Sequence, residues 1–233
     1  MYDPRQRLIV ALDVSSAAAA QKIVAAVGDS ASCYKVGMQL YTAEGPRVVR
    51  DLVASGRRVF LDLKYHDIPN TVAAAVREAA SLGVSMLTVH ASGGGKMLRA
   101  ATEAARNANA ALMVLAVTVL TSLDDKDLGN LGVHGRVQDQ VLRLAALALA
   151  DGCQGVVASA RETSALRSEL EGDFAIVNPG VRPAGAEPGD QARVATPAEA
   201  IAAGATHIVV GRPITAAADP AAEAREILSQ ISF

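Results

Sequence analysis

Three charged residues stand close together in the first third of the chain: Asp62, Lys64 and Asp67. Residues 58–63 are mostly apolar and predict a strand, in which side chains alternate between two faces. Asp62 and Lys64 therefore share one face of that strand. Charged groups in a buried strand cost free energy unless they pair with each other or take part in chemistry. A lysine ammonium held between two carboxylates can act as a general acid that protonates a carbanion.

The strand must end soon after Lys64, because Pro69 has no N–H to donate to a sheet. Asn70 or Thr71 is then expected to cap the alanine-rich helix predicted over residues 71–82. The charged residues thus lie at the C-terminal end of a strand, where a loop begins. Taken alone, Asp62 and Lys64 are as consistent with a buried structural ion pair as with catalysis.

The elements that must position these residues alternate along the whole chain. We expect strands at residues 8–13, 33–37, 58–63, 85–90, 112–120, 155–158, 174–177 and 207–211. A helical segment follows each one, and near-continuous apolar strands are typical of a parallel sheet covered on both faces. Eight such units predict a (β/α)8 TIM barrel, an α/β fold that forms a single domain over residues 1–233. An open doubly wound sheet is the alternative, but the first strand lacks the Gly-x-Gly-x-x-Gly pattern.

Charged and polar residues gather where these expected strands end. They are Asp13, Lys35, Asp62, Lys64, Asp67, Thr121, Arg182, Gly211 and Arg212. In a TIM barrel the active site forms at this end of the strands. Two lysines and three carboxylates can share one pocket only as a network of alternating charge. Singly, each residue has a plain structural explanation, and we interpret His66 and His90 as structural; the joint occurrence favours a site.

A second stretch, residues 178–193, predicts a binding loop. It is rich in glycine and proline and too long for a simple connection, and such loops often close over ligands. With Gly211 and Arg212 after the eighth strand, it matches the phosphate site of TIM barrels. Arg212 offers a planar pair of donors to phosphate oxygens, Gly211 lets the backbone approach closely, and Gln191 can reach in from the loop.

The composition of the chain argues against two classes of partner, nucleic acids and membranes. The formal net charge is -2, aromatic residues make up 3% and tryptophan is absent, so we expect no nucleic-acid partner. We also expect no membrane partner, because no apolar run is long enough to span a bilayer and no signal-peptide pattern opens the sequence. Cys33 and Cys153 are isolated, which favours buried residues in a reduced, cytoplasmic setting.

A set of short motifs resembles the orotidine 5′-phosphate decarboxylase family over essentially the whole chain. In order they are Ala-Leu-Asp13, Lys35-Val-Gly, Asp62-Leu-Lys64-Tyr-His-Asp67-Ile-Pro-Asn-Thr71, Val-Leu-Thr121-Ser, Pro-Gly-Val-Arg182-Pro, Gly-Asp-Gln191 and Gly211-Arg212-Pro-Ile-Thr. The Asp-x-Lys-x-x-Asp core alone is also similar to that of related phosphosugar decarboxylases and synthases. The His-Asp-Ile-Pro-Asn-Thr extension and the Gly-Asp-Gln segment make the resemblance specific.

The resemblance implies conversion of orotidine 5′-monophosphate to uridine 5′-monophosphate and CO2 in pyrimidine synthesis, with no metal and no organic cofactor. It implies that Lys64 donates the proton and that Asp62, Asp67 and Lys35 complete the catalytic set. The implied substrate-binding residues are Asp13, Lys35, Asp62, Ile68, Thr71, Thr121, Arg182, Gln191, Gly211 and Arg212. A homodimer with shared active sites is also implied, in which Asp67 belongs to the partner subunit's site.

Two other functions stay open at this point. One is a magnesium-dependent phosphosugar decarboxylase or aldol-type synthase on the same barrel, which needs a carboxylate-rich metal site. The other is a non-catalytic protein that binds a phosphorylated ligand without consuming it. That second function leaves the charges around Lys64 unexplained.

Overall fold

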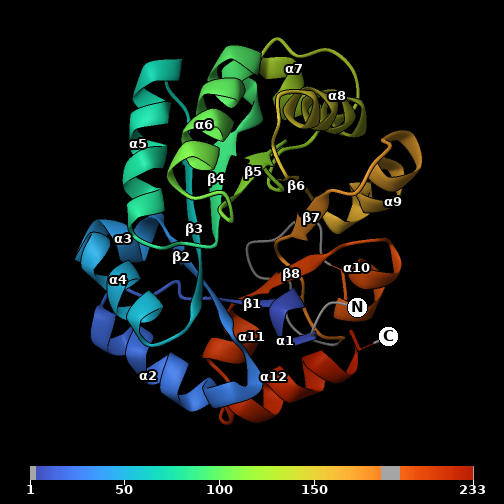
Figure 1. Ribbon diagram of the computed structural model, residues 1–233. Coiled ribbons are helices and arrows are strands. Elements are labelled where there is room, and N and C mark those ends of the chain that lie inside the picture. The colour runs from blue at the N-terminus through green and yellow to red at the C-terminus, as the bar shows by residue number, and fades with distance from the viewer. Residues whose placement is uncertain (1–3, 185–194, 233) are drawn as a thin grey trace.

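The computed structural model describes residues 4–184 and 195–232. In these residues eight parallel strands form a closed barrel in the order β1 to β8, and helices surround it (Figure 1). The strands are β1 (Leu8–Ala11), β2 (Cys33–Gly37), β3 (Arg58–Tyr65), β4 (Met86–His90), β5 (Met113–Val117), β6 (Gly155–Val157), β7 (Ala175–Asn178) and β8 (His207–Val210). The predicted TIM barrel is confirmed.

The helices lie outside the barrel and connect successive strands (Figure 1). They are α1 (Pro4–Arg7), α2 (Ala17–Val27), α3 (Met38–Glu44), α4 (Pro46–Ala54), α5 (Pro69–Ser81), α6 (Gly94–Ala108), α7 (Asp125–Asn130), α8 (Val137–Ala150), α9 (Ala160–Glu169), α10 (Pro197–Ala202), α11 (Arg212–Thr215) and α12 (Pro220–Ser229), with short 3-10 turns η1 (Gly28–Ser30) and η2 (Ala91–Gly93). No helix in the described part of the chain is long and apolar enough to cross a membrane.

Alternation along the strands divides the core into two layers. Side chains such as Ile9, Phe60 and Met86 form a cluster made of strand residues, which fills the barrel interior. Their neighbours along the strands, such as Leu61 and Leu87, pack with residues of the helices in a larger outer cluster. Asp62 and Thr88 lie two residues after Phe60 and Met86, so their side chains are also directed into the barrel.

Two expected elements differ from the structure. Residues 38–54 form two helices where a single helical segment was expected after the second strand, because Gly45 adopts a φ of 65° and Pro46 begins the second helix. The fifth strand ends at Val117 and not at Leu120. The residues that follow Val117 leave the sheet and contribute to the cavity described below.

The prediction that Asn70 or Thr71 caps α5 is wrong. The helix begins at Pro69, and Ile68 occupies the N-cap position without a capping side chain. Proline suits the first helical position because its φ is already helical and its missing N–H needs no partner there. The backbone N–H of Ile68 donates instead to Oδ1 of Asp67, at 2.6 Å.

Arg7 joins distant parts of the chain beside the strand pair that closes the barrel. Strand β1 pairs with β8. The Arg7 guanidinium donates to the carbonyl oxygens of Ala205, Thr206 and Ile231. One side chain thus satisfies three carbonyls and fixes the N-terminal helix against the last strand and the C-terminal segment.

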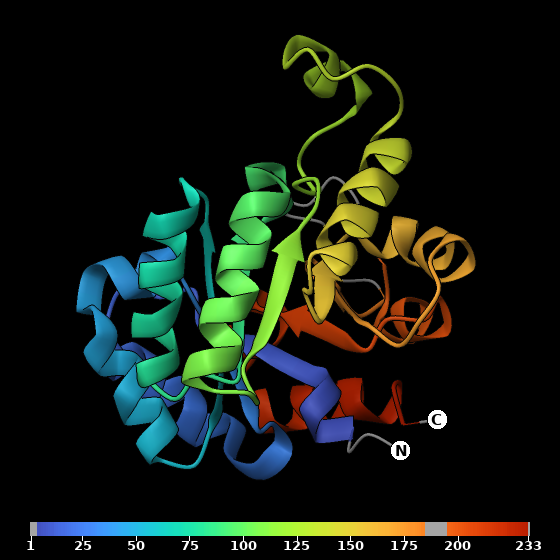
Figure 2. The same ribbon diagram turned by 45° about the horizontal axis from the view of Figure 1, so that its top comes forward.

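The segment between β5 and α8 stands away from the barrel, as the yellow-green helix at the top of Figure 2 shows. It contains α7, which Asp124 caps by accepting from the N–H of Asp127 while Asp127 accepts from the N–H of Asp124. The acidic cluster at residues 124–127 therefore serves as a helix cap.

Candidate active site

A cavity of about 480 Å³ opens at the C-terminal ends of the barrel strands. Its lining includes many of the predicted site residues, which come from both halves of the chain: Asp13, Lys35, Asp62, Lys64, Thr121, Arg182, Gly211 and Arg212. The fold thus brings together residues that lie as much as 199 positions apart, from Asp13 to Arg212.

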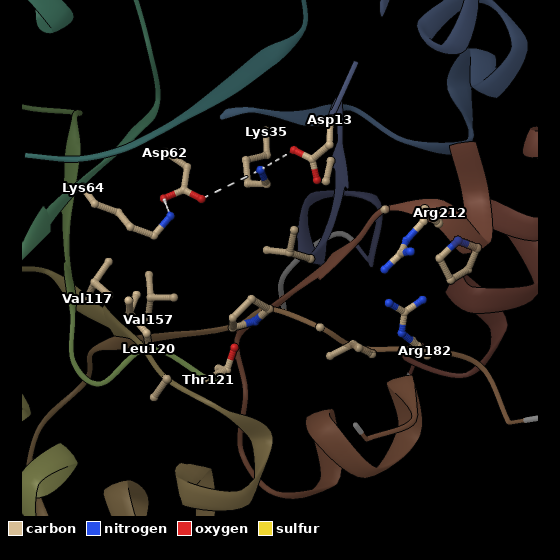
Figure 3. A pocket seen from close by; sticks show the side chains of 18 of the residues that line it. Asp13, Lys35, Asp62, Lys64, Val117, Leu120, Thr121, Val157, Arg182 and Arg212 are labelled. Atoms are coloured by element: carbon tan, nitrogen blue, oxygen red, sulfur yellow. Dashed lines mark hydrogen bonds and ion pairs between the residues drawn. The ribbon is translucent and has the colours of Figure 1, made fainter. Parts of the chain in front are cut away.

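Four charged side chains form a row along one wall of the cavity (Figure 3). Lys64 Nζ lies 2.9 Å from Asp62 Oδ1, and Lys35 Nζ lies 3.8 Å from Asp62 Oδ2. Lys35 Nζ also lies 2.9 Å from Asp13 Oδ1. The order is Lys64, Asp62, Lys35, Asp13, so that four of the five charged residues predicted for the network alternate in this row.

Burial makes this alternation necessary. The side chains of Asp62 and Lys35 are only 14% and 12% exposed. A carboxylate and an ammonium so far from water are tolerated only when each faces the opposite charge and its polar atoms are hydrogen bonded. Lys64 is 27% exposed and lies at the end of the row. Of these two paired side chains, that of Lys64 is therefore more open to the cavity than that of Asp62.

An irregularity near the end of β3 places Lys64. Leu61 pairs with Leu87 and Tyr65 with Val89, so the ladder skips from one register to another between them. Lys64 lies within this bulge at a φ of 53°, and its N–H donates to Thr88 Oγ1 at 2.8 Å. Bulges of this kind redirect side chains and are common beside functional sites. The strand consequently runs to Tyr65, two residues beyond the predicted end.

Thr88 is a polar neighbour of the row that the sequence interpretation missed. Its hydroxyl donates to Asp62 Oδ1 at 3.0 Å. A signal was available, because Met86, Thr88 and His90 alternate along β4 and so face the barrel interior. A threonine between two such positions predicts a polar contact inside the barrel.

Two arginines face the cavity away from the charged row (Figure 3). Arg182 is 8% exposed, and its Nε has no hydrogen-bond partner among the described residues. A buried guanidinium donor without a partner is costly unless a ligand supplies an acceptor. Arg212 follows Gly211 after β8 and lines the same cavity, on the side of Arg182 in the view of Figure 3. This corner of the cavity suits an anion with several oxygens, such as a phosphate.

An apolar wall completes the cavity. Val117, Leu120 and Val157 lie below the charged row in Figure 3, with Thr121 beside them. This wall offers a surface for a flat, partly apolar group, and Thr121 adds a polar edge. The valines and the leucine were not predicted as site residues, because apolar side chains at strand ends cannot be told apart from core in a sequence.

Three predicted residues do not line this cavity. Asp67, Ile68 and Thr71 lie on the exposed side of the loop and helix after β3, and Ile68 is 67% exposed. The resemblance had assigned Asp67 to a partner subunit, and its exposed position is compatible with that assignment. Gln191 belongs to residues 185–194 and lies outside the described residues.

His66 and His90 stack beside the site, with ring centroids 5.3 Å apart. Burial, the neighbouring His66 and the Lys64 ammonium lower the pKa of His90. The Nδ1 of His90 lies 2.7 Å from the hydroxyl of Ser92. In the described part of the chain, no three histidine, cysteine or acidic side chains gather closely enough to hold a metal ion.

The fold and the cavity together define a class: TIM-barrel enzymes that place a lysine–carboxylate network opposite a cationic corner for an anionic ligand. A sequence model of the Orotidine 5'-phosphate decarboxylase / HUMPS family matches residues 6–227. The chain belongs to this family.

Individual relatives agree with this assignment. The chain is 52% identical to the orotidine 5′-phosphate decarboxylase of Moorella thermoacetica over 235 residues, which covers 98% of this chain and 93% of the relative. It is 53% identical to that of Halorhodospira halophila over 226 residues, with 97% and 96% covered. The crystal structure of orotidine 5′-phosphate decarboxylase from Lactobacillus acidophilus superposes with a TM-score of 0.88 at 38% identity, covering 98% of this chain and 100% of that one.

Proposed function

We propose that this protein decarboxylates orotidine 5′-monophosphate to uridine 5′-monophosphate and CO2, a step of pyrimidine biosynthesis. Family membership supports the reaction. The observation that carries its assignment to this cavity is the Lys64 ammonium, held 2.9 Å from Asp62 in a row of alternating charge. The cavity volume of about 480 Å³ lies within the range of small-molecule sites.

The substrate lies with its phosphate between Arg182 and Arg212. The unpartnered Nε of Arg182 then gains an acceptor, and Gly211 lets a phosphate oxygen approach the backbone. We expect Gln191 to add a contact from the loop. The ends of this loop meet in a hydrogen bond from the N–H of Arg182 to the carbonyl of Ala195, at 3.0 Å.

The sugar and the base occupy the rest of the cavity. Asp13 and Lys35 contact the ribose hydroxyls at their end of the row. The pyrimidine lies against the apolar wall, with Thr121 at its polar edge. This pose directs the C6 carboxylate toward Asp62 and Lys64.

The chemical step breaks the bond between C6 and the carboxylate carbon. CO2 leaves, and the electron pair stays on C6 in the plane of the ring, where the π system cannot delocalise it. The Lys64 ammonium stabilises this pair electrostatically and then transfers a proton from Nζ to C6. Asp62 places negative charge near the departing carboxylate, so that loss of CO2 relieves repulsion in the bound substrate. Solvent returns a proton to Lys64 after product release.

Binding of the distant phosphate contributes to this step. The arginines that hold it lie across the cavity from Lys64 (Figure 3). Contacts remote from the reacting carbon can be used to close a loop and to hold the charged row in its reactive arrangement. The free energy of phosphate binding thereby lowers the barrier at C6.

The active protein is a homodimer with shared sites. Asp67, Ile68 and Thr71 are exposed and do not line their own cavity, and an exposed isoleucine beside two polar residues suits a protein interface. Asp67 completes the carboxylates around the partner's Lys64, and Ile68 and Thr71 contact the substrate bound there.

We also place the protein in the cytoplasm. Cys33 and Cys153 are both buried and free, and burial raises the pKa of each thiol to about 12. Unreactive, unpaired cysteines are typical of proteins kept in a reducing compartment.

The decisive experiment follows the absorbance of orotidine 5′-monophosphate in the presence of the purified protein and excess EDTA. The expected result is loss of the orotate absorbance and formation of uridine 5′-monophosphate at the rate seen without EDTA. Activity that disappears with EDTA and returns with Mg²⁺ would favour the metal-dependent alternative. Nucleotide binding without turnover would favour the non-catalytic one.

A further inference from the structure

Thr88 connects the two residues on which the proposed reaction depends. Its Oγ1 accepts a hydrogen bond from the backbone N–H of Lys64 and donates one to the carboxylate of Asp62. We propose that Thr88 is a positioning residue that holds Lys64 and Asp62 in their reactive arrangement. The proposal rests on the proposed function for its kinetic consequence.

The backbone of Lys64 has an unfavourable conformation that Thr88 supports. Among the described residues, Lys64 is the only non-glycine residue with a positive φ, at 53°. This left-handed conformation is unfavourable for a lysine and persists only where its surroundings enforce it. Within the bulge, β3 has no ladder partner on β4 between Leu61 and Tyr65. The N–H of Lys64 is satisfied by the Thr88 hydroxyl, at 2.8 Å.

The carboxylate of Asp62 is also bonded to Thr88. A hydroxyl has one hydrogen, and that of Thr88 is directed to Asp62 Oδ1 at 3.0 Å. The same oxygen accepts from Lys64 Nζ at 2.9 Å, and the other oxygen faces Lys35 Nζ at 3.8 Å. Thr88 therefore selects the orientation in which Asp62 gives one oxygen to each lysine.

Thr88 itself is enclosed by the protein. The residue is 0% exposed, so water does not reach its side chain to take over either hydrogen bond. Its branched side chain has few rotamers on a strand, which fixes the hydroxyl direction. Thr88 does not line the cavity, so that it acts on the reaction only through Lys64 and Asp62.

The test compares two substitutions at this position. Thr88→Val keeps the shape and removes the hydroxyl, whereas Thr88→Ser keeps the hydroxyl and removes the methyl group. The matched control is Thr102→Val in α6, which removes another buried threonine hydroxyl. That hydroxyl, in a residue 2% exposed, bonds the carbonyls of Arg99 and Asp151 outside the cavity.

We expect Thr88→Val to lower kcat for orotidine 5′-monophosphate by about 10- to 100-fold, because small displacements of reacting groups and loss of supporting hydrogen bonds have effects of this size. KM and the affinity for uridine 5′-monophosphate should stay within about threefold, since the arginine corner is unchanged. Thr88→Ser should restore kcat to within about threefold of wild type. Thr102→Val should lose thermal stability without losing kcat.

Crystal structures of the Thr88 variants give a readout that does not depend on activity. In Thr88→Val we expect Lys64 to change its backbone conformation or its Nζ to leave Asp62 Oδ1, and in Thr88→Ser we expect neither. Unchanged geometry in Thr88→Val, wild-type kcat in that variant, or an equal loss of kcat in Thr102→Val would each overturn the proposal. If wild-type protein left orotidine 5′-monophosphate unconverted, the proposed function would fail, and the structures would still decide the role of Thr88.

Discussion

At the scale of single residues, the two lysines of the row differ in what surrounds them. Lys35 lies between Asp13 and Asp62 and is 12% exposed, whereas Lys64 ends the row and is 27% exposed. Lys35 is therefore held on two sides, and Lys64 has a side left open to the cavity. This asymmetry favours Lys64 as the group that meets the reacting carbon and Lys35 as a fixed charge that orients Asp62.

Lys64→Ala should reduce turnover by about a thousandfold or more, because it removes both the proton donor and the charge that stabilises the carbanion. Binding of uridine 5′-monophosphate should persist, since the arginine corner is intact. Steady-state kinetics and calorimetric titration measure the two effects. Lys96→Ala, at an exposed lysine of α6, is the control and should behave as wild type. Near-normal turnover in Lys64→Ala would show that another group donates the proton.

His207 predicts how stability depends on pH. The residue is 4% exposed, and burial, followed by the charges of Arg58 and Arg7, lowers its pKa from 6.5 to about 4. Between pH 6.5 and about pH 4, His207 is therefore protonated in the unfolded chain and neutral in the folded protein. Stability is therefore full above pH 6.5 and is lost as the pH falls toward 4, by up to about 3 kcal/mol.

Urea unfolding at a series of pH values tests this linkage. His207→Gln should be less stable than wild type near neutral pH but should lose less stability on acidification. His134→Gln, at an exposed histidine, should follow the wild-type pH dependence. Equal pH dependence in wild type and His207→Gln would assign the acid sensitivity to other groups.

At the scale of elements, the pattern of the sequence predicted the strands better than their ends. Alternation placed Asp62 and Lys64 together, and they do meet. The bulge that brings Lys64 into a left-handed conformation was not predictable, because the N–H of Lys64 leaves the ladder and bonds Thr88 in the next strand, 24 residues away. Local propensity carries no information on such a tertiary hydrogen bond.

The junction of β2 and α3 offers a prediction at this scale. A methyl group on Gly37 would lie 2.9 Å from Lys35 Nζ and 3.4 Å from Asp13 Oδ1. The φ of Gly37 is -94°, which alanine also adopts, so Gly37→Ala should fold normally. The displaced ammonium should lower kcat/KM by about tenfold or more.

Kinetics and thermal unfolding of Gly37→Ala separate these two effects. Gly129→Ala is the matched control, because a methyl group there meets nothing within 4 Å. It should keep full activity. Wild-type kcat/KM in Gly37→Ala would mean that Lys35 tolerates displacement and is not a fixed member of the row.

At the scale of the whole molecule, most of the charged and polar residues that line the cavity could be predicted from the sequence. The reason is that a parallel barrel places the C-terminal ends of all its strands at the same end of the molecule. Asp13 and Arg212 line the same cavity for that reason alone. The apolar wall did not follow, since an apolar residue at a strand end looks the same in the core and in a site. The alternation along β4 indicated a polar contact for Thr88, but not which groups it contacts. The contribution of Gln191 stays a prediction.

Mixing two inactive variants tests the shared sites. Each proposed site takes Lys64 from one chain and Asp67 from the other. In a dimer of one Lys64→Ala chain and one Asp67→Asn chain, one site therefore carries both substitutions and the other site carries neither. Refolding the two variants together should recover about a quarter of wild-type activity with random pairing. Activity equal to the sum of the separate variants would show that Asp67 serves its own chain.

The pairing of β1 with β8, reinforced by Arg7, has a consequence for biosynthesis. The first strand leaves the ribosome long before β8, which covers its free edge, has been translated. Until then the nascent chain carries two open sheet edges, which are prone to aggregate or to recruit chaperones. Ribosome-bound chains arrested before β8 should therefore be sensitive to protease, and protection should appear only once the segment around Ile231 has emerged.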